Sequence, residues 1–114
     1  MVSEETFYRV MTLFEVHPAI SQRDVAERIG ISLGTVNSCV KELIGNGWLE
    51  AVQVKAGHHK AAHYYLLTPR GHTEKALLAL RRLATNVREY KRLKTEIAQM
   101  RREARNRSRP VRVR

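Results

Sequence analysis

Residues 20–48 read ISQRDVAERIGISLGTVNSCVKELIGNGW, a pattern that fits two short helices joined by a tight turn. Ser21 stands three residues before Asp24, which is the spacing of a capping box, where each side chain bonds the other residue's backbone. The helix that follows is expected to stop at Gly30, because glycine tolerates the left-handed backbone of a helix end. Ser32 caps the next helix almost at once. This stretch therefore predicts two helices that meet at a tight turn.

The second of these helices is expected to reach about residue 46, where Asn46-Gly47 favours a helix end. Its apolar stripe, which we expect to face inward, is Leu33, Val36, Val40, Leu43 and Ile44. Helical geometry turns a small, polar set outward: Gly34, Thr35, Ser38, Lys41 and Glu42, with Asn37 on the flank. Ala26, Gly30 and Val36 occupy positions where a helix-turn-helix needs a small residue, a turn glycine and an apolar lock. Such a helix fits the DNA major groove, about 12 Å wide; the alternative is an ordinary solvated helical hairpin.

The elements outside this stretch complete a known arrangement. Apolar residues at spacings of three and four predict a helix over 6–16, ended by His17-Pro18. Strand-forming residues over 48–54 and 62–67, with a turn between them, predict a β-hairpin. Thr68-Pro69 caps a helix that continues to about residue 106, with Gly71 near its start as its one helix-disfavouring residue. Three helices, a hairpin and a long helix make a winged helix-turn-helix, a mainly α fold of the α+β type.

The long helix carries a narrow apolar seam on a charged surface. Its members step by three and four residues: Leu80, Leu83, Val87, Tyr90, Leu93, Ile97, Met100 and Ala104. Two successive steps of three around Tyr90 make a stammer, which would locally overwind a coiled coil. We therefore expect this helix to form a homodimeric coiled coil, parallel or antiparallel. The alternative, packing onto the chain's own first helix, is expected only near the start, for Ala76, Leu77 and Leu80.

The net charge of +10 is divided unevenly along the chain. The predicted parts are a winged helix-turn-helix over 1–69, a dimerisation helix over 70–106 and a basic tail without regular structure over 107–114. Residues 1–56 hold five Lys/Arg and seven Asp/Glu, a net of −2, whereas residues 57–114 hold sixteen against four, a net of +12. The basic second half favours a polyanionic partner, and nucleic acid is the commonest one.

Composition and motifs disfavour several other classes of protein. The longest apolar run is 76–80, far below the roughly 18 residues of a membrane span, and the early acids exclude a signal segment. Cys39 is expected to be a small buried residue rather than a redox sensor, and a single cysteine suits a reducing cytoplasm. No enzyme motif is present, and no cofactor is expected. The histidines near the hairpin turn are a poor scaffold for a metal, and no metal site is expected: His58, His59, His63 and His72.

Two stretches resemble a known family. Residues 20–48 look like the recognition core of MarR-type winged-helix regulators, and Leu67-Thr-Pro-Arg-Gly71 looks like the Leu-Thr-x-x-Gly that follows their wing. Residues 32–48 with 65–71 are similar, more narrowly, to the small EPS-associated MarR-like regulators linked to bacterial exopolysaccharide gene clusters. The resemblance covers about residues 10–104. It implies a transcriptional regulator that binds an inverted repeat of double-stranded DNA.

The resemblance also implies which residues contact DNA. They are Ser21, Ser32, Thr35, Asn37, Ser38, Lys41 and Lys60. Helical geometry adds Gly34 to the DNA-facing set, and we expect His58 and His59 of the hairpin turn to lie near the DNA. The chain departs from the family in two places. Ser38 stands where many members have arginine, and the wing reads Gly57-His58-His59-Lys60 in place of the usual Asp-x-Arg. More of the affinity is therefore expected from residues outside the recognition helix.

The expected function is that of a cytoplasmic, nucleoid-associated homodimer that regulates transcription, with exopolysaccharide genes as its targets. Family members interleave helices from both chain ends and keep an effector pocket near that junction. The first expected helix is preceded by too few residues for this arrangement, so no small-molecule effector is expected. Two other functions also fit, an architectural or replication-associated DNA binder and a module that docks on a protein. The polar face of residues 35–41 offers no apolar anchor for a protein and favours DNA.

Overall fold

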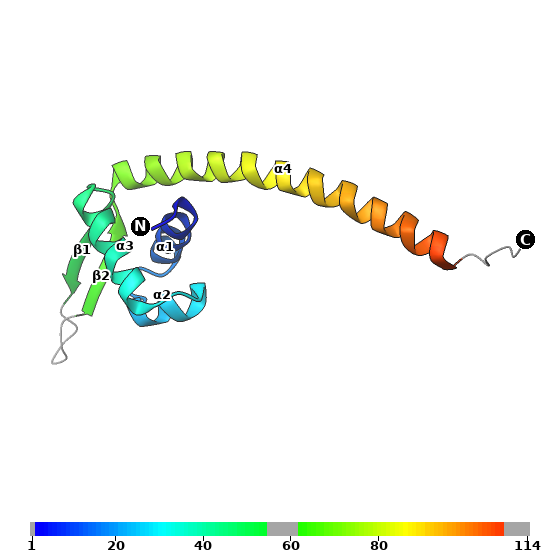
Figure 1. Cartoon of the computed structure of the whole chain (residues 1–114). Coiled ribbons are helices and arrows are strands. Elements are labelled where there is room, and N and C mark those ends of the chain that lie inside the picture. Colours follow the sequence, from blue (N-terminus) through cyan, green and yellow to red (C-terminus); the bar gives the residue numbers. More distant parts are fainter. Residues whose placement is uncertain (1, 55–61, 109–114) are drawn as a thin grey trace, which may run out of the picture. The chain divides into compact units, whose positions relative to one another are not determined.

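A computed structural model describes residues 2–54 and 62–108 of the chain, in the predicted element order (Figure 1). Its elements are α1 (Glu4–Val16), α2 (Gln22–Ile29), α3 (Leu33–Gly45), β1 (Leu49–Val54), β2 (Ala62–Leu67) and α4 (Pro69–Ser108). The mainly helical winged-helix fold is thus confirmed. The chain divides into two compact units, Met1–Leu80 and Arg81–Arg114, so the first three turns of α4 belong to the first unit.

Three serines begin the first three helices. Each hydroxyl oxygen accepts from the backbone N–H three residues on: Ser3 from Thr6 at 3.2 Å, Ser21 from Asp24 at 3.0 Å and Ser32 from Thr35 at 3.1 Å. The cap at Ser3 starts α1 two residues earlier than the apolar spacing predicts. Ser21 is a simple cap, because among the described residues no hydrogen bond runs from the Ser21 N–H to the Asp24 carboxylate. Local sequence thus sets these helix starts.

Two glycines end the helices of the helix-turn-helix. Gly30 has φ 79° and its N–H donates to the Ala26 carbonyl, which ends α2 as predicted. At the end of α3, Gly47 takes the left-handed conformation with φ 76°, whereas Asn46 stays right-handed with φ −80°. Both glycines occupy a backbone region that other residues adopt only with strain.

Every element of the first unit except β2 places a buried residue in its core, and β2 packs the partly buried Tyr65 and Leu67 against it. The buried apolar residues are Val10, Met11, Phe14, Val25, Ala26, Val36, Cys39, Val40, Leu43, Leu49 and Leu78. The predicted inward stripe of α3 was wrong at both ends, because Leu33 is 43% exposed and Ile44 is 41% exposed. Cys39 takes the centre of the buried face instead. Leu33 and Ile44 lie at the edge of the stripe in the first and last turns of the helix, where the other elements do not cover them.

The hairpin is attached to the first two helices through one tyrosine. β1 pairs antiparallel with β2 in a register that runs from Leu49 opposite Leu67 to Val54 opposite Ala62. Tyr65 of β2 places its ring 4.9 Å from that of Phe14, and its hydroxyl accepts from Gln22 Nε2 at 3.1 Å. Its backbone N–H donates to the Pro18 carbonyl at 3.0 Å. The hairpin therefore has a fixed place beside α1 and α2.

The start of α4 packs closely on the turn between α3 and β1. Thr68 caps α4 by accepting from the Gly71 N–H at 2.9 Å, and its hydroxyl donates to the Gly47 carbonyl at 2.6 Å. Gly71 itself is buried, and a Cβ added there would lie 1.9 Å from the Trp48 carbonyl oxygen. Trp48 is half-buried against the core, with its indole N–H buried and unpartnered.

The face of α4 that is turned inward at this contact differs from the one expected from the sequence. The prediction that Ala76, Leu77 and Leu80 pack inward was wrong, because all three are exposed and Leu78 is buried instead. Gly71 and Leu78 are seven residues apart, two turns of helix, so they share the inward face.

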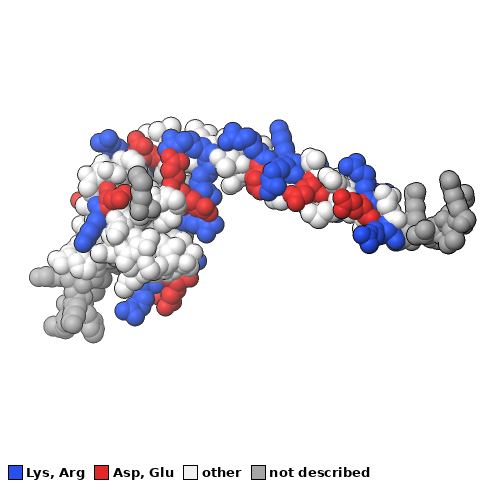
Figure 2. All heavy atoms as spheres, in the orientation of Figure 1, with Lys and Arg blue, Asp and Glu red and all other residues white. Residues whose placement is uncertain are grey.

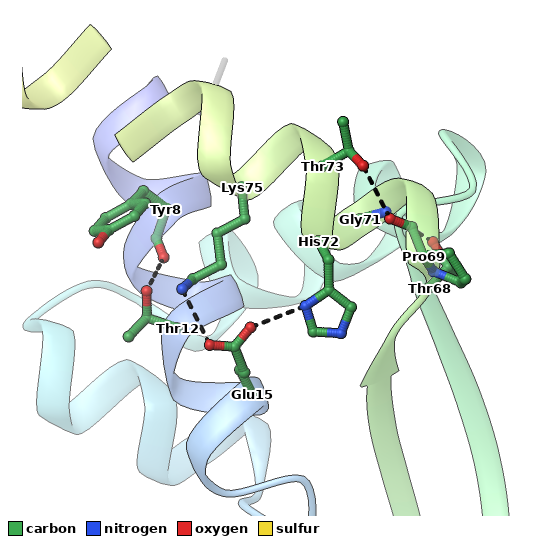
Figure 3. Close-up of polar contacts among 9 residues, drawn as sticks. All are labelled: Tyr8, Thr12, Glu15, Thr68, Pro69, Gly71, His72, Thr73 and Lys75. Carbon is green, nitrogen blue, oxygen red and sulfur yellow. Dashed lines mark hydrogen bonds and ion pairs between the residues drawn. The ribbon is translucent and has the colours of Figure 1, made fainter. Parts of the chain in front are cut away.

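A polar cluster joins the same stretch of α4 to α1 (Figure 3). The Glu15 carboxylate of α1 lies between two side chains of α4, His72 Nδ1 at 3.1 Å and Lys75 Nζ at 3.2 Å. The Lys75 ammonium also lies 5.4 Å from the centre of the Tyr8 ring, and only 17% of its side chain is exposed. This cluster, which local sequence patterns gave no reason to expect, pairs residues 60 positions apart.

Candidate nucleic-acid interface

The outward face of α3 is largely as predicted. Gly34, Asn37, Ser38 and Lys41 are exposed, as is Glu42 beside them, while Thr35 is half-buried. The opposite face holds four fully or nearly fully buried residues, so α3 is fixed on the domain by packing. A rigid helix that presents short polar side chains can enter the major groove without large rearrangement.

The two serine caps beside this face retain a hydroxyl proton. Ser21 Oγ accepts from the Asp24 N–H, and Ser32 Oγ accepts from the Thr35 N–H. A serine hydroxyl also donates one hydrogen bond, so Ser21 can still bind a phosphate oxygen. Ser32 Oγ lies 2.7 Å from Thr35 Oγ1, so one of these two hydroxyls donates to the other, and the accepting hydroxyl keeps its own proton for an outside acceptor.

Positive charge is sparse on the recognition helix itself. Lys41 is the one basic residue of α3, and the neighbouring Glu42 carries the opposite sign. By contrast, residues 81–108 hold ten Lys/Arg against three Glu, a net of +7. On the face that Figure 2 shows, blue and red atoms are interspersed along this second unit. The structure does not describe the three residues of the hairpin turn that are predicted to lie at the DNA: His58, His59 and Lys60.

The predicted seam of α4 is exposed in the single chain. Its large members are between 41% and 65% exposed: Leu80, Leu83, Val87, Tyr90, Leu93, Ile97 and Met100. Ala104 is also exposed, and a shallow hollow on the second unit lies among Tyr90, Leu93 and Ile97. An apolar row of this length on a solvated helix is unfavourable unless something covers it.

Charged side chains beside the seam are paired with one another. Arg92 donates to Glu89 Oε2 at 3.1 Å and to Glu96 Oε2 at 3.0 Å, one turn away on either side. The hydrogen bond from Arg92 lowers the pKa of Glu89, and the same bond raises the pKa of Arg92. These pairs lie fully in solvent, so they support the helix only weakly.

Among the described residues, the one thiol is buried and no cluster of metal ligands is present. Cys39 is fully buried, and burial, with a smaller effect of the Glu42 charge, raises the pKa of its thiol to about 12. No group of three or more histidine, cysteine or acidic residues that could hold a metal occurs within residues 2–54 and 62–108. Over the same residues, no helix combines the length and apolar character needed to cross a bilayer.

Residues 6–50 match the family model described as winged helix-turn-helix DNA-binding. The fold is similar to that of the PcaV transcriptional regulator from Streptomyces coelicolor, with a TM-score of 0.61 and 25% identity over 93% of this chain and 85% of that one. It is also similar to the multiple antibiotic resistance repressor MarR, with a TM-score of 0.62 and 14% identity over 95% of this chain and 78% of that one. Residues 6–50 of this chain are therefore a winged helix-turn-helix DNA-binding domain, within a fold similar to that of MarR and PcaV.

A third solved structure of similar fold contains DNA. FabT from Streptococcus pneumoniae, solved in complex with DNA, has a TM-score of 0.53 and 19% identity over 92% of this chain and 72% of that one. Comparison with proteins of curated function gives no match. In this chain, the matched residues 6–50 extend from α1 through α2 and α3 to the start of β1, and so contain the whole outward face of α3.

One residue of this surface was misassigned from sequence. Leu33 belongs by spacing to the apolar stripe, yet the structure exposes it directly after the Ser32 cap, beside Gly34. The available signal was its position, since a first-turn residue has no preceding helical turn and receives cover only from other elements.

Proposed function

We propose that this MarR-like protein regulates transcription as a homodimer bound to an inverted-repeat operator. The observation that carries the proposal is the small polar face of α3 within a matched DNA-binding domain: Gly34, Asn37, Ser38 and Lys41 are exposed on a helix whose other face is buried. Side-chain amides and hydroxyls of this kind bond the edges of base pairs in the major groove, and Lys41 suits a phosphate.

The exposed seam of the second unit supports the dimer. A second copy of the same helix would cover the apolar row from Leu83 to Met100, because identical seams are complementary in a two-fold coiled coil. A two-fold dimer presents two recognition helices, which suits half-sites about 34 Å apart on one face of DNA. Resemblance to the EPS-associated subgroup makes exopolysaccharide genes the first candidate targets.

The basic second unit supplies attraction without sequence choice. The net charge of +7 on residues 81–108 doubles in a dimer and attracts the phosphate backbone over a distance set by salt. The recognition helix, with one lysine and one glutamate beside it, adds little to this attraction. Affinity and sequence choice are therefore assigned to different parts of the chain.

Selection of genomic fragments by the purified full chain, followed by footprinting, tests the proposal. A regulator protects a short palindrome near a promoter, whereas broad protection without a defined site indicates an architectural DNA binder. A dimer that contacts about eight phosphates should show a slope near −7 for log affinity against log salt. A flat salt dependence would overturn DNA binding altogether.

A charge-matched pair of variants links this binding to α3. Lys41→Ala should reduce the salt slope by about 2 per dimer, since each subunit loses one phosphate contact. Arg9→Ala removes the same charge from α1, where Arg9 pairs with Glu5 at 3.1 Å, and should leave the slope unchanged. Equal effects of the two variants would contradict the placement of α3 in the groove.

A further inference from the structure

A large apolar side chain stands exposed at the tip of the recognition helix. Leu33 is the first residue of α3, directly after the Ser32 cap, and is 43% exposed. Ile44, the other exposed large apolar residue of α3, lies eleven positions on, in the last turn, about 16 Å along the helix axis. Leu33 is therefore the apolar group that enters a groove when the N-terminal end of α3 leads.

Leu33 is the one residue in the first turn of α3 whose side chain is both long and exposed. Gly34 has no side chain, and Val36 is fully buried. Thr35 is half-buried, with its hydroxyl 2.7 Å from Ser32 Oγ and its N–H bonded to the same oxygen. Gly34 also removes the bulk that would hold the helix tip away from base edges.

A leucine can recognise only one of the groups that base pairs present in the major groove. It neither donates nor accepts a hydrogen bond, so it gains nothing from base oxygens, ring nitrogens or amino groups. The C5-methyl of thymine is the apolar group on this edge, and apolar side chains pack against it. We propose that Leu33 contacts one thymine methyl in each half-site and thereby selects a T·A pair there. This inference rests on the proposed function.

The expected effect follows from the apolar surface removed from water. One buried methyl group changes affinity about fourfold, and two symmetric half-sites give about fifteenfold for a dimer. The effect is confined to one symmetric pair of positions, whereas a phosphate contact would weaken binding to all sequences alike.

Replacement of thymine by deoxyuridine provides the test, because deoxyuridine pairs identically and lacks only the methyl group. Duplexes of the genomically selected site carry this replacement at each thymine in turn, symmetrically in both half-sites. The full-length wild-type chain should lose about fifteenfold at one position. Leu33→Ala should bind the natural duplex more weakly and show no loss there, while Leu33→Met, which keeps an apolar reach, should retain the loss.

Ile44→Ala is the matched control, since this residue is 41% exposed on the same helix and should retain the wild-type sensitivity. Selective binding without methyl sensitivity at any position would overturn the role of Leu33 and leave the proposed function standing. If Leu33→Ala remains sensitive to loss of the thymine methyl, the role of Leu33 is likewise overturned while the proposed function stands. Failure of the wild-type chain to select any site would overturn the proposed function and the Leu33 contact together.

Discussion

The substitution Gly71→Ala adds only one methyl group, but it should strongly destabilise the first unit. A Cβ at this position would lie 1.9 Å from the Trp48 carbonyl oxygen, 2.9 Å from its carbon and 3.2 Å from the Trp48 Cα. All three neighbours are backbone atoms, so no side chain can rotate away. The contact between α4 and the turn that joins α3 to β1 must open by about 1 Å, which is severe overpacking.

The magnitude follows from three contributions. Overpacking of this kind costs about 2–3 kcal/mol. Displacement of the Trp48 carbonyl also weakens its hydrogen bond from the Thr68 N–H, now 3.1 Å, which is worth about 1 kcal/mol. The higher helix propensity of alanine returns up to about 1 kcal/mol. The free energy of unfolding should therefore fall by about 2–3 kcal/mol, a decrease in Tm of about 10–20 °C for a domain of this size.

The fluorescence of Trp48 is a suitable assay, because this is the single tryptophan of the chain and lies at the contact itself. Gly45→Ala is the matched control: this helical glycine has open space around the position of a Cβ, so its Tm should stay unchanged or rise slightly. A Gly71→Ala variant that melts within about 2 °C of the wild type would refute the close packing of α4 on the Trp48 backbone.

Three further predictions concern other parts of the chain. Ile97→Glu places a carboxylate in the seam and should convert the proposed dimer into monomers by sedimentation equilibrium, whereas Thr95→Glu on the opposite helix face should not; an Ile97 variant that remains dimeric excludes the seam as the interface. Cys39, with its pKa raised to about 12 by burial, should resist thiol reagents at pH 8 until urea unfolds the domain, and its contribution to stability, complete below pH 9, should be lost as the pH rises towards 12; rapid native labelling would contradict its burial. Glu15→Gln weakens the pairs with Lys75 and His72 and should lower the free energy of unfolding by about 0.5–1 kcal/mol in a urea titration, and an unchanged midpoint would disprove this contribution.

Features set within a few residues were predictable from the sequence. Ser21, Ser32 and Gly30 fixed the ends of the two helices of the helix-turn-helix, because a cap needs only a side chain and the next turn of backbone. The hairpin followed from strand-forming residues on either side of a turn. The apolar seam of α4 followed from spacing alone, and its large members are exposed in the single chain.

Features set by contacts between distant residues were not predictable in this way. The sequence pattern placed Leu33 and Ile44 in the core, since periodicity shows an apolar stripe without showing how wide a face the other elements cover. It likewise assigned Leu77 and Leu80 to the inward face of α4, where Leu78 lies instead. In both cases the error is in which apolar residues are covered and not in which segment is helical.

By itself, then, the sequence determined the order of elements, the polar face of α3 and the seam of α4, because each depends on caps, turns and helical periodicity. Tertiary structure alone decided how α4 is rotated and which side chain stands at the helix tip. The rotation depends on two contacts between distant residues. Gly71 lies against the Trp48 carbonyl, 23 positions away in the sequence, and Glu15 binds Lys75, 60 positions away. The exposure of Leu33 depends on where the other elements end, which no local pattern encodes.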